Sequence, residues 1–64
     1  MNKQEEFEWV VKVIKSCKTF LQIVSSDRLI NLYAKRYPDY TALTELISIR
    51  NNHYTTIREK DTLT

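Results

Sequence analysis

The stretch that decides the fold runs from Thr19 to Tyr37 and reads TFLQIVSSDRLINLYAKRY. Thr19 and Gln22 have the T-x-x-Q spacing of a capping box, in which each side chain accepts a hydrogen bond from the other residue's backbone N–H. A proline disfavours helical geometry in the residue before it, so Pro38 is expected to end this helix at Tyr37. We therefore predict a helix over residues 20–37.

This middle helix has apolar residues on two of its sides when successive residues are placed about 100° apart. One apolar row, which includes the small Ser26, contains Ile23, Ile30, Tyr33, Ala34 and Tyr37. The other, interrupted by Arg28, contains Leu21, Val24 and Leu32. A helix that is apolar on two sides needs covering on two sides, so the second row indicates a surface where a partner would sit.

A first helix is predicted over residues 3–17. Asn2 and Glu5 have the N-x-x-E spacing of a second capping box. Glutamates gather at the start of this helix and lysines at its end, which suits the helix dipole. Its apolar face contains Phe7, Val10, Val11, Ile14 and Cys17, with a half-buried Trp9 beside it.

A third helix is predicted over residues 40–59, after the turn signal Pro38-Asp39, with Asp39 or Thr41 as its cap. Its apolar face contains Leu43, Leu46, Ile47, Tyr54 and Ile57, with Arg50 and His53 in the same row. Residues 60–64 are expected to form a frayed tail.

Three helices joined by short links predict an all-α fold, a small up-down-up three-helix bundle that makes residues 1–64 a single domain. The absence of glycine and the presence of one proline favour helices over hairpins. An alternative follows from the unbroken apolar spacing that extends as far as Val24. The first helix would then run to about residue 24, and Ser25 or Ser26 would cap a shorter second helix from Asp27.

The net charge, the cysteine content and the hydropathy of the chain limit the classes of protein to which it can belong. The net charge is only +2, although residues 12–36 carry six basic side chains against one acidic side chain. A single cysteine cannot form an internal disulfide. No apolar run approaches the roughly 20 residues of a membrane span, and the acidic start is unlike a signal peptide. These features predict a cytoplasmic protein with no membrane role.

Catalytic and metal chemistry find little support in the sequence. His53 and Cys17 are the only residues of their types, whereas a metal site needs several converging ligands. We expect Cys17 to be a small core residue and His53 to lie at the edge of the core. The stem of Arg50 is expected to lie along the core while its head reaches water or a carboxylate. The sequence thus predicts no enzyme, no cofactor, no metal and no small-molecule substrate.

The function we predict is that of a small protein–protein interaction module, with a second copy of the chain or another protein as its partner. The residues expected to bind this partner are Leu21, Val24, Arg28 and Leu32, with Phe20 and Leu29 as candidate neighbours. Arginine among large apolar residues is common at binding hot spots.

The alternative function is that of a DNA-binding regulator of helix-turn-helix type that uses the third helix. The residues expected to contact nucleic acid are Thr44, Ser48, Asn51, Asn52, Lys35 and Arg36. The uncharged polar groups of the four residues on the third helix suit base edges. Glu45 lies where it would repel phosphate, and a low net charge provides few phosphate contacts, so this alternative ranks second.

Overall fold

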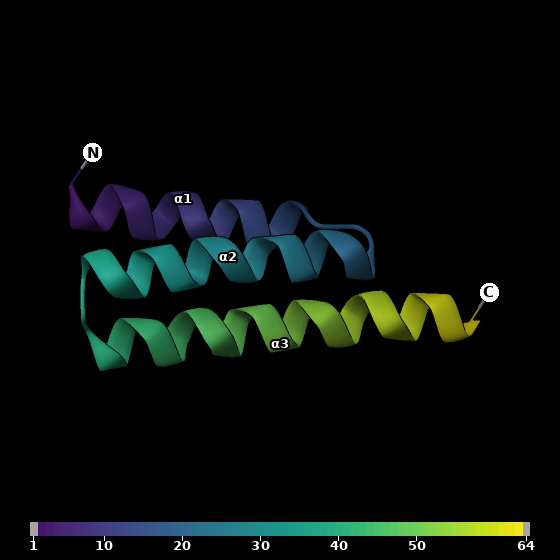
Figure 1. Cartoon of the computed structure of the whole chain (residues 1–64). Coiled ribbons are helices and arrows are strands. Elements are labelled where there is room, and N and C mark those ends of the chain that lie inside the picture. Colours follow the sequence, from purple (N-terminus) through teal and green to yellow (C-terminus); the bar gives the residue numbers. More distant parts are fainter. Residues whose placement is uncertain (1, 64) are drawn as a thin grey trace.

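The computed structural model is a bundle of three helices, α1 (Lys3–Ser16), α2 (Phe20–Arg36) and α3 (Tyr40–Leu63), each in contact with the other two. The helices run side by side in up-down-up order, and α3 extends beyond the end of the other two (Figure 1). The structure describes the backbone of residues 2–63 and the side chains of residues 2–59. The predicted fold class is confirmed, and the helix ends near residues 17 and 37 are correct to within one residue.

The break between α1 and α2 lies at the predicted position. Thr19 is the N-cap of α2, and its hydroxyl accepts a hydrogen bond from the backbone N–H of Gln22 at 3.2 Å. The Gln22 side chain accepts in turn from the backbone N–H of Lys18 at 2.6 Å, one residue before the expected donor. The alternative of a first helix that continues to residue 24 is wrong, because these two bonds stabilise an extended backbone at Thr19.

The other two helices also begin at polar caps. The Asn2 side chain accepts from the backbone N–H of Glu5 at 2.8 Å. Asp39 caps α3, because its Oδ1 accepts from the backbone N–H of Thr41 at 3.1 Å and of Ala42 at 3.3 Å. At its far end α3 runs to Leu63, so it is longer than the predicted 40–59. The side chains of the expected tail, residues 60–64, lie outside the described part of the chain.

The core lies along the axis of the bundle and receives side chains from all three helices. Its larger cluster of buried residues contains Val10, Ile14, Ile30, Tyr33 and Leu46. A smaller one contains Cys17, Ile23 and Ile57. Ser26 is buried on the same side of α2, and its hydroxyl donates to the Ile23 carbonyl at 2.7 Å, so burial leaves no polar group unpaired there.

The predicted apolar faces of α1 and α2 are confirmed, whereas that of α3 needs a correction. Ile47 was placed on the buried face, yet 43% of it is exposed. Ile49 and Ala42, which we did not assign to that face, pack against the larger cluster instead. The face of α3 is therefore rotated from the predicted one, since α3 has to fill the groove that α1 and α2 form together.

An ion pair joins the first turns of α1 and α3. Lys3 Nζ donates to Asp39 Oδ2 at 2.6 Å. The hydrogen bond from Lys3 lowers the pKa of Asp39 below its ordinary value of 3.8, and the backbone N–H groups of Ala42 and Thr41 act in the same direction. Because the folded pKa is depressed, the contribution of Asp39 to stability is complete above pH 3.8 and is lost as the pH falls through the folded pKa.

Removal of the Lys3 ammonium is expected to raise the pKa of Asp39 in the folded protein. In Lys3→Met the pKa should move towards 3.8 without reaching it, since the backbone N–H groups still donate to the carboxylate. Carboxyl-carbon NMR titration measures this directly. Lys15→Met, at the other end of α1, serves as the control, and an unchanged Asp39 pKa in Lys3→Met would contradict the assignment of the ion pair.

Loss of the Thr19 hydroxyl is expected to destabilise the N-terminus of α2 and therefore the folded chain. Thr19→Ala should lower the free energy of unfolding by about 1 kcal/mol, the usual effect of removing an N-cap. Urea denaturation followed by circular dichroism measures the change. Thr55→Ala, in the exposed middle of α3, is the control and should leave stability unchanged or slightly higher. Equal losses in the two variants would show that the cap has no special role.

Candidate partner-binding surface

The residues predicted to bind a partner lie together on the outward side of α2. We call Leu21, Val24, Arg28 and Leu32 the α2 outer face. All four are exposed, and the exposed fractions of Leu21 and Leu32 reach 76% and 61%. Neither α1 nor α3 covers them, because the opposite side of α2 carries the buried residues. The second apolar row of α2 is therefore open surface in this chain.

A groove between α1 and α2 runs beside the α2 outer face. Its wider part is a hollow of about 310 Å³ whose apolar lining includes Trp9, Leu29 and Leu32. A second hollow of about 300 Å³ adjoins it at Leu29 and has smaller, more polar walls such as Ser16 and Ser25. An apolar face beside an open groove is typical of a surface that receives a segment of another protein.

An ion pair closes the wide end of this groove. Arg36 Nη1 lies 2.9 Å from Glu6 Oε1, and the pair joins the last turn of α2 to the first turns of α1. The two residues lie 30 positions apart in the sequence, so no local spacing announces the pair. Sequence reasoning missed it for that reason.

The two candidate neighbours of the α2 outer face lie on different sides of α2. Phe20 is exposed and makes an edge-on contact with the ring of Tyr54 on α3, at a centroid distance of 5.5 Å. Leu29 is half-buried, packs against the core and forms part of the groove towards α1. Leu29 thus belongs with the groove, whereas Phe20 closes the bundle on its α3 side.

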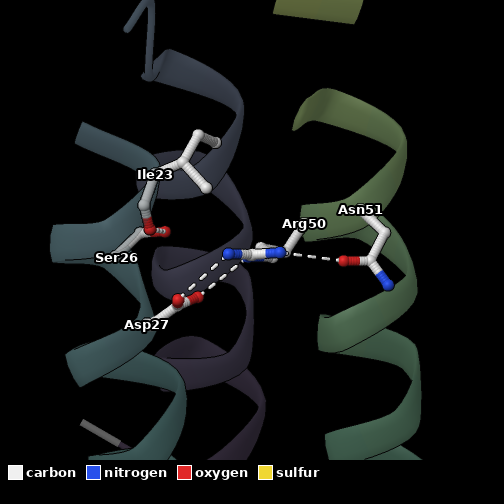
Figure 2. A network of polar contacts seen from close by, with 5 residues as sticks. All are labelled: Ile23, Ser26, Asp27, Arg50 and Asn51. Atoms are coloured by element: carbon white, nitrogen blue, oxygen red, sulfur yellow. Dashed lines mark hydrogen bonds and ion pairs between the residues drawn. The ribbon is translucent and has the colours of Figure 1, made fainter. Parts of the chain in front are cut away.

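Arg50, the charged residue in the apolar row of α3, is bound within the bundle (Figure 2). Its Nε donates to Asp27 Oδ1 at 2.9 Å, and its Nη2 donates to Asp27 Oδ2 at 3.1 Å. A further Nη1 bond reaches the Asn51 side chain at 3.0 Å. The expectation that the Arg50 head reaches a carboxylate is confirmed. This bidentate pair also occupies the only acidic side chain of α2.

Cys17 and His53 meet, but in a way that stabilises the fold. The thiol of Cys17 donates to the Val13 carbonyl at 3.3 Å. His53 Nε2 lies 2.6 Å from the Cys17 carbonyl oxygen, and because a carbonyl only accepts, this nitrogen carries the proton. Burial raises the pKa of the Cys17 thiol, the reverse of what a nucleophilic cysteine requires. Both residues lie where we predicted, in the core and at its edge.

The residues of the nucleic-acid alternative are exposed, but two of them are already bound to other side chains of the bundle. Those from α3 are Thr44, Ser48, Asn51 and Asn52, and those from α2 are Lys35 and Arg36. Arg36 turns towards α1 to pair with Glu6, and Asn51 accepts from Arg50. In addition, α2 and α3 lie side by side and antiparallel (Figure 1), whereas the helices of a helix-turn-helix cross at about 90–120°.

Within the described part of the chain, no group of three acidic, histidine or cysteine residues is placed to hold a metal ion. The helices there also include none that is long and apolar enough to cross a membrane. Comparison of the chain with protein-family models, with curated proteins and with solved structures gives no match. The features of the molecule that bear on its function are therefore those of the bundle surface described above.

Two substitutions on α2, two residues apart, should differ sharply in their effect on folding. Leu32→Asp should change the free energy of unfolding by less than about 1 kcal/mol, because an exposed side chain loses little packing. Ile30→Asp should unfold the chain, because only 4% of Ile30 is exposed and a carboxylate there would be buried without a partner. Thermal melts by circular dichroism separate the two. Loss of helix in Leu32→Asp at low temperature would make Leu32 a core residue.

Proposed function

We propose that the chain is a small protein–protein interaction module and that the α2 outer face is its binding surface. The observation that supports this most directly is the exposure of Leu21, Val24 and Leu32 in one row beside an apolar groove. Several large apolar side chains exposed on one side of a small domain are typical of a site of association, because leaving them in water forgoes the free energy of burial. The proposed setting is the cytoplasm, consistent with a buried, unpaired Cys17.

The composition of the face supports the proposal further. Arg28 lies among the three aliphatic residues, and within residues 2–59 it has no ion-pair or hydrogen-bond partner. Arginine beside large apolar groups is enriched at binding hot spots, because its stem packs while its head forms several hydrogen bonds. Tryptophan is also enriched at binding hot spots, and Trp9, which lies across the groove, is 45% exposed. No catalytic role is proposed.

A DNA-binding regulator is the alternative function. Its support is the exposed, uncharged polar side of α3, which includes Thr44, Ser48 and Asn52. The antiparallel packing of α2 and α3 counts against it (Figure 1). One experiment can address both functions.

The proposal is tested by affinity capture of the tagged full chain from lysate of its native host, with and without nuclease treatment. A bound protein should survive nuclease and should be lost in the double variant Leu21→Asp/Leu32→Asp, because carboxylates would enter the apolar contact. Quantitative mass spectrometry should show a loss of about tenfold or more.

Tyr40→Asp is the matched control, since it replaces another exposed large side chain by aspartate at the start of α3, away from the α2 outer face. It should retain the captured protein. Equal capture by the double variant and the wild type would overturn the proposed surface. Nucleic acid as the only specific catch would instead favour the DNA-binding alternative, and α3 would become the helix to mutate.

A further inference from the structure

The open side of α2 is basic as well as apolar. Beyond Arg28, this helix carries Lys35 and Arg36 near its end and has a single acidic residue, Asp27. Asp27 is already bound through both carboxylate oxygens to Arg50 on the α3 side of the helix (Figure 2). The cations on the outward side of α2 therefore have no unpaired acidic neighbour from their own helix.

Among the described residues that line the groove beside this face, one side chain is acidic, that of Glu6. Glu6 is bound to Arg36 at the wide end of the groove. Arg28 and Lys35 have no ion-pair partner among the described side chains. The helical spacing puts both on the same side of α2 as Leu21 and Leu32, and each lies about one helical turn from Leu32. An apolar row flanked by free cations is complementary to an apolar row flanked by carboxylates.

This charge pattern disfavours a second copy of the chain as the occupant. A twofold contact between two α2 outer faces would bring the basic groups of each copy, Arg28 and Lys35, against an equally basic surface. Like charges brought together across an interface repel one another and disfavour association. No carboxylate on the outward side of α2 is available to offset that repulsion.

The shape of the surface favours a helix over a flat or extended occupant. The groove between α1 and α2 is concave, apolar at Trp9 and Leu32, and continuous with the second hollow through Leu29. At about 1.5 Å per residue, the row from Leu21 to Leu32 spans about 16 Å, which corresponds to three helical turns. Helices bind such grooves through apolar anchors at i, i+3 or i+4, and i+7.

We propose that the partner presents an acidic amphipathic helix of about three turns, which lies along the groove between α1 and α2 as a fourth helix. Its apolar residues contact Trp9, Leu21 and Leu32, and its Asp or Glu side chains bind Arg28 and Lys35. This inference rests on the proposed function, because it names the partner class for the same surface. The Glu6–Arg36 pair closes the wide end of the groove.

The test is a display selection against the full chain with a library of amphipathic helices about 15 residues long. Leucines are held at anchor positions, and the flanking positions vary among Glu, Lys and Gln. Glutamate should dominate the flanking positions of the selected helices. A synthetic acidic peptide from the pool should then bind at least about tenfold more tightly than its Glu→Lys counterpart. Trp9 is the only tryptophan of the chain, so the fluorescence of Trp9 can report the binding of a peptide that contains no tryptophan.

Charge-reversal variants locate the recognition. Arg28→Glu should weaken the acidic peptide by about tenfold or more, and higher salt should weaken the wild-type complex. Lys15→Glu changes the net charge equally but lies on the α3 side of α1, in a hollow lined also by Ile49 and His53. It should change the affinity by no more than about twofold. Equal effects of the two variants would overturn the assignment of the carboxylate contacts.

The remaining outcomes separate this inference from the proposed function. Lysine-rich or charge-neutral helices that still require Leu21 and Leu32 would overturn the acidic partner and leave the interaction surface intact. Acidic helices that bind Leu21→Asp/Leu32→Asp as well as the wild type would overturn both. A dimer in sedimentation that Leu32→Asp dissociates would make a second copy the occupant. Binding to phosphatidylserine vesicles that Arg28→Glu abolishes, without peptide selection, would make it a lipid surface. Either result overturns the inference.

Discussion

The rest of the structure depends on the packing of one side of α2 against both other helices. Ile23, Ile30 and Tyr33 bury themselves between α1 and α3, and the small Ser26 in the same row allows close approach. Three helices around one axis cover only the inward side of each. Whatever side chains the outward side of α2 carries must therefore face water or a partner, and in this chain they are leucines, a valine and an arginine.

The charged residues of the bundle include some that form ion pairs between helices and others that do not. Glu6, Asp27 and Asp39 each bind a cation on another helix, so they stabilise the arrangement of the helices. The other group includes Arg28 and Lys35, which have no such partner among the described side chains. Because Glu6 and Asp27 are bound to cations within the bundle, the outward side of α2 remains basic, although the whole chain has a net charge of only +2.

Local rules in the sequence were sufficient for the three helices and for most of their ends, although the predicted third helix stops at residue 59 and the apolar spacing also allows a first helix that extends to residue 24. Thr19, Asn2 and Asp39 all form the caps that their spacing predicts, because a capping bond spans three residues and needs nothing from elsewhere in the chain. The inward and outward sides of α2 follow equally from a period of about 3.6 residues. The exposed row on α2 was predicted on the same basis, so the candidate surface itself was visible in the sequence.

Contacts between residues far apart in the sequence depend on how the three helices pack. The face of α3 turned Ile49 inward and left Ile47 half exposed, because α3 has to fit a groove whose shape two other helices set. The pairing of Asp27 with Arg50, and of Glu6 with Arg36, joins residues 23 and 30 positions apart, and no periodicity reports such contacts. Local sequence patterns thus predict the three helices, the caps at Asn2 and Thr19, and the apolar side of α2 that is left open. The packing determined which charges remain free on that side, because pairing across helices depends on three-dimensional distance and not on spacing along the chain.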